Sequence, residues 1–266
     1  MLDKNYQSHI FNYIDNNKLP HSIIISGDRG CGKHSLLYYI SDKFNLEIED
    51  ITSKLNSDNI IDLNLKLTKK IYCIEANNIS IKEQNAILKT LEEPIQNNYI
   101  IILIDNINLL LETIRNRCFI LQFKPYPLTY LESLSECKDP RLFKLINTPG
   151  DLNKYKYLNT FELDKIFELS TKILTCIGRA SIPNTLTILN KLDFEDSEKN
   201  IDAYLLIKSL KVNIVDLLIK GELKFNNINE VLKLLNKLEI DLTNNRLNKQ
   251  KLFENFLLEL KNIYGY

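Results

Sequence analysis

The segment Ser22-Ile23-Ile24-Ile25-Ser26-Gly27-Asp28-Arg29-Gly30-Cys31-Gly32-Lys33-His34 decides the fold. Its first five residues are a short β-branched run that is typical of a buried strand. The glycines and Lys33 have the spacing of a loop that binds phosphate through backbone N–H groups. A helix is predicted next, because apolar residues recur at three- and four-residue steps at Leu36, Leu37, Ile40 and Phe44. The alternative is a glycine-rich turn that binds nothing, and the flanking strand and helix disfavour it.

The phosphate loop departs from the complete motif at its metal-binding positions. A complete loop carries Ser or Thr after the Lys, where the hydroxyl binds Mg²⁺, whereas this chain has His34. In an ATPase of this class a later strand ends in Asp-Glu, which supports the metal and positions the attacking water. Here Ile74 and Glu75 stand at those two places. We therefore expect Mg²⁺ binding to be weak or absent, while the phosphate cradle is kept by Gly27, Gly30, Gly32 and Lys33.

The composition is that of a folded protein without a strong net charge. Of the 266 residues, 44% are hydrophobic and 26% are charged, as in ordinary globular chains. The 34 basic and 34 acidic residues cancel, so net charge gives no sign of nucleic acid binding and any DNA contact needs a local patch. No apolar run approaches the roughly 20 residues that span a bilayer. We therefore expect a soluble, cytoplasmic protein with no membrane contact.

Cysteine and histidine residues are scattered along the chain rather than grouped. An odd number of cysteines without a signal peptide is typical of reduced intracellular thiols. No two of the five cysteines have the two-residue spacing of a zinc site, and none of the three histidines is assigned to a metal. The sequence therefore predicts no zinc and no other metal site. These residues are Cys31, Cys73, Cys118, Cys137, Cys176, His9, His21 and His34.

The first half of the chain alternates strand and helix signals. Further apolar runs at 71–74, 99–104 and 119–123 predict strands that are covered on both faces. A helix is predicted between the first two runs, because Ser80 and Glu83 form a capping box, and Pro94 stops it. This alternation predicts an α/β fold with a parallel, doubly wound sheet.

The second half carries only helix-period signals. After Pro125 and Pro127, apolar stripes recur at helical spacing over 163–177 and 231–238, and a final amphipathic helix is predicted around 253–260. We interpret these stripes as core rather than as a cofactor site. The predicted organisation is a nucleotide-binding-like domain at 1–124, a small helical lid at 125–159 and an all-α domain at 160–266.

Two sequence blocks carry a resemblance to a known family. The first is Asn85-Ala86-Ile87-Leu88-Lys89-Thr90-Leu91-Glu92-Glu93-Pro94, and the second, after a strand, is Thr113-Ile114-Arg115-Asn116-Arg117-Cys118. Together they resemble the AAA+ subunits of the bacterial DNA polymerase III clamp loader. The second block normally reads Thr-Ile-Arg-Ser-Arg-Cys in that family, and its last Arg is a finger inserted into a neighbouring subunit's ATP site. The resemblance identifies Arg117 as that finger, and segment 244–260 also resembles the last helices of the family's collar domain.

Within this family the altered metal positions resemble the delta-prime subunit, which does not hydrolyse ATP. Segment 147–151 stands where an active subunit carries a basic sensor, and its Asp151 would repel phosphate. The usual sensor threonines are also absent around Ile104 and Asp105. One departure is the lack of the four-cysteine zinc module that many delta-prime subunits carry before Ile71.

The resemblance implies a non-hydrolysing clamp-loader subunit in DNA replication. Such a subunit presents Arg117 in trans to ATP in an adjacent motor subunit, and ATP bound at its own loop would not be hydrolysed. The implied partners are gamma/tau-like motor subunits, a delta-like wrench subunit, the sliding clamp and primer-template DNA.

Three alternatives remain open at this stage. The chain could be an active ATPase motor in which Ser35 binds Mg²⁺ and Glu75 suffices, although a one-residue shift turns a side chain by about 100° around a helix. Arg115 and Arg117 could be ordinary surface arginines at a helix end. Lys82 and Lys89 share one helical face, which could meet a DNA phosphate or simply water. Adjacent Glu92 and Glu93 diverge on a helix, and we interpret them as a surface or interface feature rather than a catalytic pair.

Overall fold

The computed structural model describes residues 6–56, 69–92, 98–137, 139–156, 158–179, 202–221, 228–242 and 248–264. The chain forms two compact units. An α/β unit comprises Met1–Leu134 with Asn147–Tyr155, and a helical unit comprises Ser135–Ile146 with Lys156–Tyr266.

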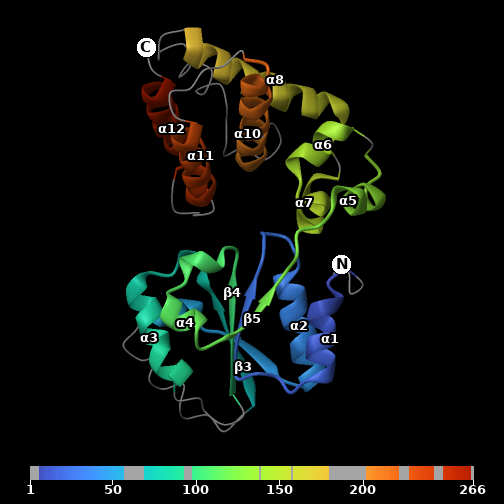
Figure 1. The fold of residues 1–266 in the computed structure, drawn as a ribbon, viewed down its shortest axis with the longest axis vertical. Coiled ribbons are helices and arrows are strands. Elements are labelled where there is room, and N and C mark those ends of the chain that lie inside the picture. Colours follow the sequence, from blue (N-terminus) through green and yellow to red (C-terminus); the bar gives the residue numbers. More distant parts are fainter. Residues whose placement is uncertain are drawn as a thin grey trace. The chain divides into compact units, whose positions relative to one another are not determined.

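The α/β unit is built on a five-stranded parallel sheet with the order β2-β3-β4-β1-β5 (Figure 1). The strands are β1 (Ser22–Ser26), β2 (Glu47–Asp50), β3 (Lys70–Glu75), β4 (Asn98–Ile104) and β5 (Phe119–Gln122). Four of them coincide with the apolar runs that predict strands, so the predicted parallel α/β fold is confirmed. The edge strand β2 was missed because Glu47-Ile48-Glu49-Asp50 has almost no apolar signal.

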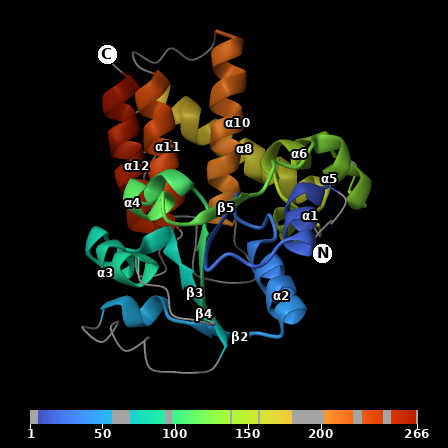
Figure 2. The ribbon, with the colours of Figure 1, turned by 60° about the horizontal axis from the view of Figure 1, so that its bottom comes forward.

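Helices cover both faces of this sheet. Figures 1 and 2 show α2 (Lys33–Phe44) on one side and α3 (Ile81–Glu92) on the other. One buried cluster joins Ile87 and Leu91 of α3 to the sheet through alternate strand residues, including Ile24, Ile74 and Ile102. Because successive strand side chains point to opposite faces, the intervening residues face the side of α2. Burial on both faces explains why the strands read as nearly continuous apolar runs.

Polar contacts fix α3 and the turn that follows β4. The predicted capping box is present, since Glu83 Oε2 accepts from Ser80 N at 2.5 Å and Ser80 Oγ accepts from Glu83 N at 3.3 Å. The buried Gln84 side chain donates to Leu109 O at 3.1 Å and accepts from Leu111 N at 2.8 Å. Gln84 therefore ties α3 to the segment that leads into α4 (Glu112–Arg115).

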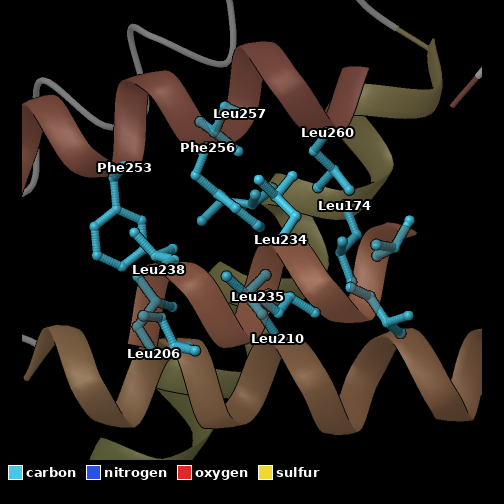
Figure 3. Close-up of a cluster of buried hydrophobic side chains, with 14 of the residues drawn as sticks. Leu174, Leu206, Leu210, Leu234, Leu235, Leu238, Phe253, Phe256, Leu257 and Leu260 are labelled. Atoms are coloured by element: carbon cyan, nitrogen blue, oxygen red, sulfur yellow. The ribbon is translucent and has the colours of Figure 1, made fainter. Parts of the chain in front are cut away.

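The helical unit has its own apolar core. Its helices are α6 (Pro140–Leu145), α8 (Thr160–Arg179), α10 (Ala203–Ile219), α11 (Ile228–Leu242) and α12 (Lys249–Tyr264). Figure 3 shows side chains from α10, α11 and α12 pointing toward one another around fully buried residues such as Leu210, Leu235 and Phe253. Four residues of the predicted stripe at 231–238 face this core, as do Ile173 and Leu174 of the other stripe, whereas Leu232 is exposed. The side chain of Ile177, which the second stripe also included, lies outside the described residues.

The remaining helices of the α/β unit are α1 (Ser8–Asn16), α5 (Leu128–Leu134) and α7 (Pro149–Tyr155). The residues expected to form a lid at 125–159 are divided, because α5 and α7 belong to the α/β unit and α6 to the helical unit. The three-domain division stays a prediction. In the described part of the chain, none of the helices combines the length and apolar character needed to cross a membrane.

Candidate nucleotide site and arginine finger

The predicted phosphate loop connects β1 to α2 and depends on its glycines. Gly27, Gly30 and Gly32 have φ angles of 152°, 82° and 112°, in the region that side chains disfavour. A Cβ atom on Gly27 would lie 2.7 Å from the Cβ of Phe123, and one on Gly30 would lie 2.7 Å from Thr148 Oγ1. The loop conformation therefore requires glycine at these positions, whatever the loop binds.

Lys33 is bound within its own loop. Its side chain is only 7% exposed, and Nζ donates to Gly27 O at 2.6 Å, to Asp28 O at 3.1 Å and to Asp105 Oδ1 at 2.6 Å. An ammonium group has three N–H donors, so all of them have acceptors. Asp105 follows β4, the neighbour of β1, and the carboxyl ends of these parallel strands meet at the loop. Sequence reasoning missed Asp105 as the partner of Lys33, although its place at the end of an adjacent strand is a usable signal.

His34 and Glu75, which occupy the expected metal-ligand and water-positioning places, bind each other. His34 Nε2 lies 2.8 Å from Glu75 Oε1, and the two side chains are 56% and 52% exposed. Since a carboxylate only accepts, the ring nitrogen is the donor in this contact. Ile74, at the other expected metal position, is 1% exposed and packs in the apolar cluster beneath α3. Ser35, named in the alternative metal scheme, is exposed on α2.

These side chains do not fit a Mg²⁺-bound triphosphate. Mg²⁺ requires oxygen ligands in near-octahedral geometry. The loop offers an imidazole where a hydroxyl is needed, and the carboxylates of Glu75 and Asp105 each hold a neighbouring donor. Among the residues that the structure describes, His, Cys, Asp and Glu side chains nowhere gather in a group of three or more that could hold a metal ion. The loop thus has the backbone of a phosphate loop but lacks the hydroxyl that the complete motif places after the Lys.

The start of α7 packs directly on the loop. Gly150 N donates to Gly30 O at 3.0 Å, and Thr148 Oγ1 donates to Arg29 O at 3.0 Å. The approach is so close that a Cβ on Gly150 would lie 2.6 Å from Gly30 Cα. Asp151 Oδ2 accepts from Asn147 N at 3.2 Å, so this carboxylate stabilises the turn into α7. The sequence predicted neither the contact nor this capping role.

Cys31 lies inside the loop and is chemically quiet. Burial raises the pKa of its thiol to about 11, although the positive charge of Lys33 acts in the opposite direction. The Cys31 carbonyl accepts from the buried Tyr126 hydroxyl at 2.9 Å. Because only the thiolate is nucleophilic, this cysteine serves packing rather than reaction at neutral pH.

The predicted finger, Arg117, lies just after α4. Its Nη2 is 2.7 Å from Glu92 Oε1, its Nη1 donates to Thr113 O at 2.9 Å, and its side chain is 37% exposed. Arg115 differs because it is partly buried and reaches Asn108 Oδ1 only at 3.5 Å. The pairing of Arg117 with Glu92 was missed by sequence reasoning, which interpreted Glu92 only as a surface or interface residue.

Comparison with known proteins bears on these motifs. Residues 36–127 match the family described as DNA polymerase III, delta subunit, and this range includes α3, Glu92 and Arg117. This part of the chain is therefore similar to the DNA polymerase III clamp-loader family. None of the curated proteins matches it.

Solved structures resemble this chain in fold. A DNA polymerase III gamma subunit-related protein from Thermotoga maritima is 18% identical, with 97% of this chain and 99% of that chain covered and a TM-score of 0.40. The RuvB Holliday junction branch migration motor of Thermotoga maritima is 15% identical, with 80% and 77% covered and a TM-score of 0.47.

Proposed function

We propose that this chain is a delta-prime-like clamp-loader subunit: it does not hydrolyse ATP and contributes Arg117 in trans to an ATP site on a neighbouring subunit during sliding-clamp loading. The observation that carries this proposal is the hydrogen bond between His34 and Glu75. It joins the side chains at the two positions where an active subunit carries a Mg²⁺ ligand and the residue that positions the attacking water. The enclosed ammonium of Lys33 supports the same conclusion.

The finger role follows from the chemistry of phosphoryl transfer. Negative charge on the transferred group spreads over its oxygens in the transition state, and a guanidinium offers a planar fork of N–H donors to them. Such a finger accelerates turnover by roughly 10³- to 10⁵-fold in systems where it is supplied to another site. The chain would thus be catalytic only through its neighbour.

The remaining assignments rest on the similarity of residues 36–127 to this family. The partners of the proposed complex are gamma/tau-like motor subunits, a delta-like wrench subunit, the sliding clamp and primer-template DNA. The helical unit, with its separate core, is the candidate collar through which the subunits assemble.

The competing function, an active ATPase motor, has no contact in its favour among the residues that the structure describes. It requires Ser35 to take the place of the missing metal ligand and Glu75 to position water, yet Glu75 is engaged by His34. Ser35 lies one position further along α2, which places it about 100° around the helix.

The proposal is tested by clamp-stimulated ATP hydrolysis in the reconstituted complex. We expect Arg117→Ala to lower turnover by roughly 10³-fold or more, because the transition-state contact is lost. Arg117→Lys should also be strongly impaired, since a point charge does not replace the fork. Lys54→Ala is the charge-matched control, because Lys54 is an exposed cation that pairs with Glu49. Turnover by Arg117→Ala equal to wild type refutes the finger role.

A further inference from the structure

Glu92 forms an ion pair with the proposed finger, Arg117. It is the last residue of α3, and its Oε1 lies 2.7 Å from Arg117 Nη2. The other terminal nitrogen, Nη1, donates to Thr113 O at 2.9 Å. The guanidinium is therefore held at two nitrogens, by a carboxylate from α3 and by a carbonyl of α4.

The helix that carries Glu92 is packed and hydrogen-bonded to its surroundings. The capping box of Ser80 and Glu83 fixes the start of α3, and Ile87 and Leu91 anchor its apolar face at 2% and 6% exposure. Gln84 ties the same helix to the segment before α4 through two hydrogen bonds. A functional side chain is held accurately when its partner stands on a packed helix rather than on a loop.

The two contacts orient Arg117 without using up its donors. A guanidinium has five N–H groups; within the described residues one of them, on Nη1, donates to Thr113 O, while Nη2 forms an ion pair with Glu92. An arginine that is already restrained loses less rotamer freedom when it docks on a phosphate. A flexible arginine, by contrast, must be ordered at the moment of reaction.

We propose that Glu92 is a positioning residue for Arg117, holding the guanidinium plane so that its remaining donors meet the phosphoryl oxygens of the neighbouring subunit's ATP. This inference rests on the proposed finger function. It assigns Glu92 no contact with the nucleotide, so its removal acts on the rate of the reaction and not on ATP affinity.

The test is a double-mutant cycle on clamp-stimulated ATP hydrolysis by the reconstituted complex. We expect Glu92→Ala to lower kcat roughly 10-fold, below the ~10²-fold reached when a reacting group is misplaced by about 1 Å, with the KM for ATP unchanged. Glu92→Gln keeps an acceptor and should recover part of this loss. The double variant Glu92→Ala, Arg117→Ala should be no slower than Arg117→Ala alone, because Glu92 acts only through Arg117. Glu112→Ala, which removes an exposed carboxylate from α4, is the matched control and should retain wild-type turnover.

The outcomes separate this inference from the function on which it rests. If Arg117→Ala slows turnover and Glu92→Ala does not, the positioning role is wrong while the finger survives. A rise in turnover for Glu92→Ala also overturns it, because the pair would then restrain the finger. Additive losses in the double variant would show that Glu92 acts on general structure. Unchanged turnover for Arg117→Ala overturns both proposals.

Discussion

Lys33 and Arg117 are both cations in motifs that are associated with nucleotide binding, but their surroundings in the structure differ. The Lys33 side chain is 7% exposed, and all three of its donors are bound by Asp105 and two loop carbonyls. Arg117 is 37% exposed, and in the described part of the chain it is held by an ion pair with Glu92 and by one hydrogen bond to Thr113 O. Lys33 thus stabilises its own loop, whereas the more exposed Arg117 can form hydrogen bonds with another subunit.

The difference shows how one chain can keep the shape of a nucleotide site and yet act elsewhere. In the loop, each side chain that would touch Mg²⁺ or phosphate has an internal partner: Lys33 has Asp105, and His34 has Glu75. At the end of α4, the partner Glu92 orients the cation without enclosing it. We therefore expect substitutions in the loop to lower the free energy of unfolding, and substitutions around Arg117 to lower ATP turnover in a neighbouring subunit.

The largest difference should appear when each cation loses its carboxylate. Asp105→Ala leaves a buried ammonium without its counterion and should lower the free energy of unfolding of the α/β unit by about 1–3 kcal/mol, reduced from the fully buried case because the Asp105 side chain is 32% exposed. Glu92→Ala breaks a pair whose side chains are 37% and 52% exposed, and should lower it by less than about 1 kcal/mol. Hydrogen exchange of peptides from β1 and α2 in increasing urea measures both, since the two units need not unfold together.

A companion variant sharpens this result. Lys33→Met removes the buried charge together with its need for a partner, so it should be less destabilising than Asp105→Ala. If Asp105→Ala and Glu92→Ala lowered the free energy of unfolding equally, the proposed difference between the enclosed Lys33 and the more exposed Arg117 would be wrong.

An effect of similar size is expected where α7 meets the loop. Gly150→Ala places a Cβ 2.6 Å from Gly30 Cα, and such overpacking should lower the free energy of unfolding of the α/β unit by about 1–3 kcal/mol. Exchange of the loop amides at 27–33 should accelerate with it. Gly221→Ala, at a site with φ of 70° and open space, is the control and should leave the loop unchanged. Unaltered loop exchange in Gly150→Ala would show that α7 does not hold the loop.

Much of the α/β unit could be predicted because its sheet is buried on both faces. The run Ile23-Ile24-Ile25 and the run at 99–104 are apolar at nearly every position, as central parallel strands must be. β2 could not be predicted, because an edge strand of Glu47-Ile48-Glu49-Asp50 obtains its conformation by pairing with β3 rather than from its own residues.

The candidate site was predictable in its residues but not in its contacts. Glycine spacing identifies the loop, and the departures at His34 and Ile74 are visible in the sequence. That His34 binds Glu75, that Asp105 encloses Lys33 and that Gly150 touches Gly30 depend on segments between about 40 and 120 positions apart. Only the folded sheet brings such segments together.

The most direct test of the central claim is ATP hydrolysis by the purified chain in the presence of Mg²⁺. Because His34 and Glu75 bind each other and Lys33 is enclosed, we predict turnover no higher than that of Lys33→Ala. Turnover clearly above background that Lys33→Ala abolishes would contradict the account, since it would mean that this loop binds metal and nucleotide for its own reaction.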